Sequence, residues 1–106
     1  MTETELRENI RDAAKKLGWG FYHTWTSLHS AKGFPDLVLV RAGHAQCPGR
    51  VIFAELKTDI GKTSPEQDEW LAALAACPGV EVYLFRPADW DSGEIARVLS
   101  KEGRSG

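Results

Sequence analysis

The sequence has few cysteines and lacks long apolar runs. Its two cysteines, Cys47 and Cys77, stand alone without CxxC spacing, so we expect free thiols rather than a disulfide framework or a zinc site. No apolar run approaches the ~20 residues that span a membrane. The N-terminus, MTETELRENI, is polar and acidic, so we expect no secretory signal peptide. These absences predict a cytoplasmic protein in a reducing compartment.

Positive charge is not in excess either. The 13 basic and 15 acidic residues leave a formal net charge of -2, whereas a nucleic-acid binder is often basic overall. Any contact with phosphate must therefore come from a local basic patch or a bound cation. The 106 residues are 42% hydrophobic and 26% charged. This balance is that of an ordinary globular protein, and it predicts a single domain over residues 1–106 with a flexible tail at 101–106.

Three helices are predicted from apolar periodicity and capping residues. The first spans residues 3–17, with Thr2 or Thr4 as the N-cap and Gly18 at its C-terminal stop. A second helix lies within residues 64–76, where Ser64 is the N-cap and Pro65 the first helical residue. A third lies within residues 91–100, with Ser92 as the cap. The apolar stripe of the first helix consists of Leu6, Ile10, Ala13, Ala14 and Leu17.

Four strands are predicted, at residues 21–25, 36–40 and 51–57 and within 78–87. The segment 36–40 is apolar on both faces, as in a sheet that is covered on both sides. A turn-rich connection, RAGHAQCPGR, joins it to the next strand, so the two strands are expected to form a hairpin. The order α-β-β-β-α-β-α predicts an α/β fold in which helices flank a small sheet.

One predicted strand carries polar residues in an otherwise apolar segment. In FAELK, Glu55 and Lys57 are two residues apart and therefore point to the same face. The expected hairpin brings Asp36 close to Glu55. Two adjacent carboxylates repel each other unless a cation neutralises them, and oxygen ligands are what Mg²⁺ prefers. Such a cation can bind a phosphate oxygen and lower the pKa of a bound water, while Lys57 can help activate the water or stabilise charge on the phosphate.

Each fragment also has an ordinary structural interpretation. An aspartate after a proline can simply end a loop, and Glu-x-Lys on a strand is usually a solvated ion pair. The two fragments together, on adjacent strands and after a Gly-x-Pro-Asp turn, favour the functional interpretation.

The ordered motifs resemble those of the PD-(D/E)XK nucleases. Pro35-Asp36 is followed, after eighteen residues, by Glu55-Leu56-Lys57. The segments GFPDLVLV, FAELKTDIGKTSPEQDEWLAAL and GVEVYLFRP are similar to characteristic blocks of the VRR-NUC branch of that superfamily. The bare pattern recurs by chance, but Gly33 before it and Gln67 after it make the set more specific. The resemblance covers nearly the whole chain and implies a restriction-endonuclease-like core, as in short stand-alone phage and bacterial members.

The resemblance implies a role for each motif residue. Asp36 and Glu55 would bind Mg²⁺ or Mn²⁺, and the backbone carbonyl of Leu56 would also face the metal. Lys57 would be the catalytic lysine.

Two further site residues come from the helices. The family usually adds a glutamate from the first helix, where Glu3 extends the apolar stripe whereas Glu5 and Glu8 lie away from it. Glu3 is therefore the favoured additional metal ligand. The family also places a glutamine near the active site, which would be Gln67. The run Ser64-Pro65-Glu66-Gln67 is equally a helix capping box, and the two roles are not exclusive.

Substrate contacts are expected from residues near the motifs. His23, Ser30 and Lys32 could line a cleft beside Asp36, although a histidine on a β-prone stretch is more often packed or hydrogen-bonded. Lys62 could contact phosphate, although most such charges serve only solvation. Other basic side chains with the same potential are Arg7, Arg11, Lys15 and Arg41.

By resemblance, the chain is expected to be a Mg²⁺- or Mn²⁺-dependent DNA endonuclease that hydrolyses phosphodiester bonds. Short members of the family look like homodimers that act on branched DNA such as four-way junctions, in the bacterial host cell if phage-encoded. The alternative within enzymes is a flap or end-processing nuclease. Outside enzymes, the alternatives are a non-catalytic nucleic-acid- or protein-binding module on the same fold and a structural phage protein with an accidental motif.

Overall fold

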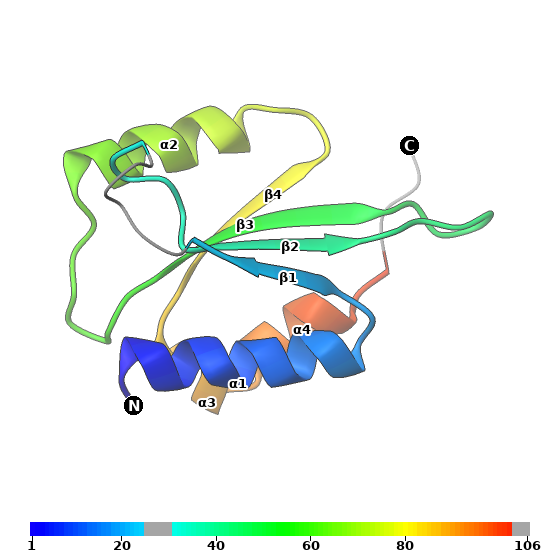
Figure 1. Cartoon of the computed structure of the whole chain (residues 1–106), viewed down its shortest axis with the longest axis horizontal. Helices are drawn as coiled ribbons and strands as arrows, with labels where there is room; N and C mark the ends of the chain where they lie inside the picture. Colours follow the sequence, from blue (N-terminus) through cyan, green and yellow to red (C-terminus); the bar gives the residue numbers. More distant parts are fainter. Residues whose placement is uncertain (25–30, 103–106) are drawn as a thin grey trace.

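The computed structural model describes residues 1–24 and 31–102. Its four strands form one mixed sheet in the order β1-β2-β3-β4, in which only β4 runs parallel to its neighbour. Helix α2 lies on one face of the sheet, and α1, α3 and α4 lie on the other (Figure 1). This is the predicted α/β architecture. The elements are α1 (Glu3–Lys16), β1 (Gly20–His23), β2 (Leu37–Arg41), β3 (Arg50–Leu56), α2 (Pro65–Ala75), β4 (Val80–Phe85), α3 (Pro87–Asp91) and α4 (Glu94–Ser100).

Helix α1 begins with a capping box and ends at a turn. The Thr2 side chain accepts a hydrogen bond from the Glu5 backbone N–H, and the Glu5 side chain accepts one from the Thr2 N–H. Gly18 has a φ of 84°, which is a left-handed conformation that favours glycine and ends the helix. The prediction that Leu17 belongs to the buried stripe is wrong. It lies at the C-cap, where the chain leaves the helix, and is 38% exposed.

The core lies between the sheet and the helices α1 and α4. Strands β2 and β3 pair antiparallel with Leu37 opposite Ala54, which confirms the expected hairpin. On the face of β3 toward the core, Ile52, Ala54 and Leu56 follow the buried Arg50, and Phe53 and Glu55 point to the opposite face beneath α2. The core consists of Leu6, Ile10, Ala14, Trp19, Leu37, Leu39, Ile52, Ala54, Leu56, Phe85, Ile95, Val98 and Leu99.

The C-terminal region differs most from the sequence prediction. The sequence does not predict helix α3. It predicts one helix within residues 91–100, whereas in the structure Asp91 ends α3 and α4 begins at Glu94. Gly93, with a φ of 84°, is the N-cap of α4, so the assignment of Ser92 is wrong: it is the C-cap of α3. Its hydroxyl still accepts a hydrogen bond from the Glu94 N–H at 3.3 Å.

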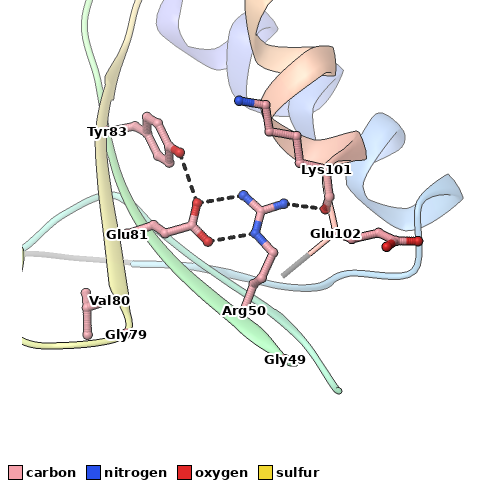
Figure 2. Close-up of a pocket in the computed structure, with 8 residues that line it drawn as sticks. All are labelled: Gly49, Arg50, Gly79, Val80, Glu81, Tyr83, Lys101 and Glu102. Atoms are coloured by element: carbon pink, nitrogen blue, oxygen red, sulfur yellow. Dashed lines mark hydrogen bonds and ion pairs between the residues drawn. The ribbon is translucent and has the colours of Figure 1, made fainter. Parts of the chain in front are cut away.

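Arg50 joins the start of β3 to β4 and to the end of α4. Its guanidinium donates two hydrogen bonds of 2.6 Å to the Glu81 carboxylate, and Figure 2 shows this pair with Tyr83 bonded to the same carboxylate. Arg50 also donates to the carbonyls of Val98 at 2.9 Å and Lys101 at 2.7 Å. Lys101, where the flexible tail was expected to begin, is thus tied to the sheet, and residues 103–106 lie outside the described structure.

The sequence predicts neither disulfide bonds nor membrane-spanning helices, and the described residues bear on both. Cys47 and Cys77 are both free, as predicted from their spacing. No helix within residues 1–24 and 31–102 is long and apolar enough to cross a membrane.

Candidate active site

Two carboxylates meet at the end of the sheet where β2 begins and β3 ends. Asp36 immediately precedes β2, and Glu55 is the penultimate residue of β3. The pairing of Leu37 with Ala54 places these two residues opposite each other on neighbouring strands. The Leu56 backbone N–H donates a 2.9 Å hydrogen bond to Asp36 Oδ2, which fixes the orientation of that carboxylate. The hairpin register therefore brings together the two acids that the sequence singled out.

Glu55 has the most perturbed environment in the site. Its side chain is almost fully buried, with 2% of the residue exposed. Burial raises the pKa of Glu55 to about 9, and the neighbouring Asp36 carboxyl adds to the rise. Within the described residues, Glu55 Oε2 is buried and has no hydrogen-bond partner. A carboxylate oxygen in this position is costly unless a cation or donor satisfies it.

These residues fit a magnesium-type ion rather than a metal held by protein side chains alone. No group of three or more His, Cys, Asp or Glu side chains within residues 1–24 and 31–102 could hold a metal ion. Mg²⁺, however, commonly uses one or two carboxylates and completes its octahedron with waters and substrate phosphate. Asp36, the unpartnered oxygen of Glu55 and the Leu56 carbonyl supply oxygen donors of this kind.

A small pocket of about 50 Å³ lies beside Asp36. Glu3 and Arg7 from α1 line it, with His23 from β1 and Leu56 from β3. Glu3 thus lies at this pocket but does not complete a three-carboxylate cluster. The volume suits an ion or a few waters, whereas sites that enclose small organic ligands measure roughly 300–1,000 Å³. A ligand as large as a nucleotide therefore does not fit inside this pocket.

Gln67 combines the two roles that its sequence position allowed. Its side-chain oxygen accepts a 2.8 Å hydrogen bond from the Ser64 N–H, which completes the capping box of α2. Its side-chain nitrogen donates a 3.2 Å hydrogen bond to Glu55 Oε1. The N-terminus of α2 therefore holds one oxygen of Glu55 and leaves the other unpartnered.

Gly33 allows the loop before Asp36 to pack directly on α2. Its φ is 86°, and a Cβ placed on it would lie 2.6 Å from the Glu66 carbonyl carbon and 2.7 Å from the Gln67 nitrogen. Only glycine permits this approach. The next residue, Phe34, packs edge-on against Trp70 of α2 and Phe53 of β3, with ring centroids 5.0 and 6.0 Å away. These contacts set the position of Asp36 relative to Gln67.

His23 lies on the α1 side of the pocket. Its Nε2 is 3.3 Å from Arg7 Nη1. Burial lowers the pKa of His23, and the Arg7 charge lowers it further, with Asp36 opposing the change. The lowered pKa favours the neutral ring, in which Nε2 can accept a hydrogen bond from Arg7 when Nδ1 carries the proton.

The other expected substrate contacts are spread around the site. Lys32 is largely exposed and forms a 3.3 Å ion pair with Glu66. Lys57 is half-buried directly after β3, and Lys62 is exposed on the following loop. Ser30 lies outside the described residues.

Arg86 holds the loop that follows Lys57, which the sequence did not indicate. Its guanidinium donates hydrogen bonds to the carbonyls of Thr58 at 2.6 Å and Gly61 at 2.7 Å. Asp59 in the same loop accepts a 3.1 Å bond from the Ala88 N–H. The sequence places Arg86 within the predicted strand segment 78–87, where no local pattern indicates these partners.

The comparison with known families agrees with this geometry. The family model for the VRR-NUC domain matches residues 1–89 of the 106-residue chain. No match was found among curated proteins or among solved structures. VRR-NUC domains have a PD-(D/E)XK-like fold, and the mixed sheet with flanking helices is of that kind. The chain therefore belongs to the VRR-NUC domain family, which indicates a nuclease-type function.

Proposed function

We propose that residues 1–106 form a single domain that acts as a metal-dependent DNA endonuclease and hydrolyses phosphodiester bonds. The observation that carries this proposal is the buried Glu55 carboxyl, which faces Asp36 and has one oxygen without a partner in the described structure. Such an arrangement is unfavourable for folding alone. It is reasonable at a site whose carboxylates serve a bound cation and its substrate.

The proposed roles are those that the family resemblance implies, and the meeting of Asp36 and Glu55 at one end of the sheet supports them. Asp36, Glu55 and the Leu56 carbonyl would hold Mg²⁺ or Mn²⁺, and Glu3 is the further ligand proposed from the same pocket. When bound, the metal lowers the pKa of a water and offsets negative charge on the phosphate. Lys57 directs its ammonium toward the charge that develops during cleavage.

The remaining residues hold the site or the substrate. Gln67 fixes Glu55 through its hydrogen bond to Oε1. His23, Ser30, Lys32 and Lys62 are proposed to contact the DNA around the cleaved bond.

We further propose a homodimer that acts on branched DNA such as a four-way junction. A domain of 106 residues offers little surface to grip a duplex, and a two-fold dimer presents two active sites. Apolar surface for such an interface lies on β1 and β2, on the part of the sheet face that α2 does not cover. Tyr22 and Val40 are 60% and 50% exposed, and the strand register places both on the same face of the sheet.

The test is cleavage of end-labelled four-way junction, flap and linear duplex DNA with Mg²⁺ or Mn²⁺ and with a chelator. Wild-type protein is expected to cut the junction only with metal. Lys57→Ala and Asp36→Asn are expected to abolish cutting, while their exposed counterparts on α1, Lys16→Ala and Asp12→Asn, retain it.

Other outcomes would replace the proposal. Preferential cutting of flaps or ends would change the substrate class to an end-processing nuclease. Binding of DNA without cutting, with Lys57→Ala identical to wild type, would favour a non-catalytic binding module.

A further inference from the structure

The Arg7 side chain is a cation on the side of the site that α1 forms. It lies four residues after Glu3 on α1, and residues with this spacing share one face of a helix. Both line the small pocket that contains Asp36 and the Leu56 backbone. The side chain is half-buried, so it is directed along the protein surface toward the site rather than into open solvent.

The surroundings of Arg7 differ from those of other arginines in this chain. Among the described residues, Arg11 pairs with Glu8, Arg50 with Glu81 and Arg97 with Glu94. Arg41 and Arg86 form no ion pair there, but each donates two hydrogen bonds to backbone carbonyls. In the part of the chain that the structure describes, Arg7 forms no ion pair with a carboxylate, and its side-chain hydrogen bond is to neutral His23. A guanidinium has five N–H donors, so most of its donors remain for another acceptor.

We propose that Arg7 binds the phosphate at the cleaved bond and that His23 is a positioning residue that orients the Arg7 guanidinium. This inference rests on the proposed nuclease function. A planar guanidinium matches two oxygens of a phosphate. The pocket is too small for a nucleotide, so the phosphate at its mouth comes within reach of Arg7 on one side and of the site carboxylates on the other. Contact with His23 restricts the rotamers of a long side chain, which lowers the entropy lost when phosphate binds.

The first experiment compares two arginines on the same helix, Arg7→Gln and Arg11→Gln. Cleavage by wild-type protein first maps the bond that is cut. Binding is then measured by fluorescence anisotropy in the inactive Lys57→Ala background, with junction DNA that carries either a normal phosphate or a neutral methylphosphonate at that bond. Arg7→Gln is expected to weaken binding of the normal DNA about tenfold and to have less than about a twofold effect on the methylphosphonate DNA. Arg11→Gln is expected to change both affinities equally.

The second experiment tests the positioning role of His23. His23→Gln retains a side-chain oxygen that can accept from Arg7, whereas His23→Leu does not. We expect His23→Leu to lower the cleavage rate severalfold and His23→Gln to restore most of it. In the Arg7→Gln background both substitutions are expected to lose most of their effect, because His23 acts mainly through Arg7. An unchanged effect of His23→Leu in that background would overturn the positioning role.

The outcomes separate this inference from the proposed function. If wild-type protein cuts no DNA, the nuclease proposal fails and the Arg7 assignment fails with it. If wild-type protein cuts but Arg7→Gln behaves like Arg11→Gln, or weakens both DNAs equally, only the Arg7 assignment is overturned. Thermal melting of each variant identifies any loss that comes from unfolding.

Discussion

The position of Gly33 has two requirements that only glycine meets. Its positive φ of 86° disfavours any side chain, and a Cβ would overlap the backbone of Glu66 and Gln67. Gly79 has a similar φ of 78° but open space around it, so it is a matched control. We expect Gly79→Ala to cost about 1 kcal/mol and Gly33→Ala at least ~2 kcal/mol in urea unfolding. Gly33→Ala should also reduce cleavage, because Asp36 and Gln67 move apart. Equal costs for the two variants would contradict the close approach.

Glu55 permits a test of metal binding that does not depend on activity. A ligand that binds only the folded state at 100 times its Kd stabilises it by about 2.7 kcal/mol, which raises the Tm of a domain of this size by several degrees. We expect saturating Mg²⁺ or Mn²⁺ to raise the Tm of the wild type and of the exposed control Glu69→Gln. Glu55→Gln should lose this increase. A metal-induced increase in Tm that persists in Glu55→Gln would show that the metal binds at another site.

At this scale, the sequence predicted that Asp36 and Glu55 come together and that Gln67 lies near them, but not the contacts of Arg7 and Arg86. Asp36 and Glu55 were found because a charge is anomalous next to apolar strand residues, and the hairpin register followed from adjacent strands. The contact of Arg7 with His23 spans sixteen residues, and Arg86 contacts carbonyls more than twenty residues earlier. Such partners are far apart in the sequence and come together only when the chain folds, so no local sequence pattern predicts these contacts.

At the scale of elements, the start of α2 serves stability and the site together, and two substitutions separate these functions. Gln67→Glu keeps a capping-box acceptor for the Ser64 N–H but replaces the donor to Glu55 with a second carboxylate. We therefore expect a stable helix and strongly reduced cleavage. Ser64→Ala removes the N-cap at a cost of about 1 kcal/mol and should leave cleavage nearly unchanged at temperatures where the protein is folded. Circular dichroism melts and cleavage rates measured together give the comparison. Full activity in Gln67→Glu would limit Gln67 to capping.

The elements were predicted best where capping and periodicity agree. Helices α1 and α2 both begin with a capping box that is present in the sequence, and β2 and β3 contain the continuous apolar runs 37–40 and 51–54. Helix α3 has only five residues, which is too short for periodicity to appear. Its first residue, Pro87, lies in the segment 78–87 for which the sequence predicts a strand. The Ser92 hydroxyl suits an N-cap, whereas the backbone turn before α4 is made by Gly93.

At the scale of the whole molecule, the Arg50–Glu81 pair ties the sheet to the C-terminal helix and gives a pH-dependent stability. The hydrogen bonds from Arg50 hold the pKa of Glu81 below its usual value of 4.5. The stabilisation is therefore complete above that pH and is lost as the pH falls through the lowered pKa. Glu81→Gln leaves the buried Arg50 without its charge partner, so we expect a loss of roughly 3 kcal/mol at pH 7 and a smaller difference near pH 3.

Urea unfolding at several pH values measures this dependence. The exposed pair between Arg97 and Glu94 supplies the control, because Glu94→Gln should leave stability nearly unchanged at every pH. A stability loss in Glu81→Gln that stays the same from pH 7 to pH 3 would show that packing, rather than charge, holds this end of the sheet.

The proposed dimer is tested through the sheet face that α2 leaves open. An apolar patch of this kind on a small domain commonly marks an interface, and a charge placed within it is costly to bury. Tyr22→Glu is therefore expected to shift the protein from dimer to monomer in sedimentation equilibrium at micromolar concentration. Leu17→Glu, at an exposed apolar position at the C-cap of α1, should remain dimeric. If the two active sites cut a junction together, the Tyr22→Glu monomer should nick one strand slowly and lose paired cuts. A wild-type protein that sediments as a monomer would refute the dimer and leave each site to act alone.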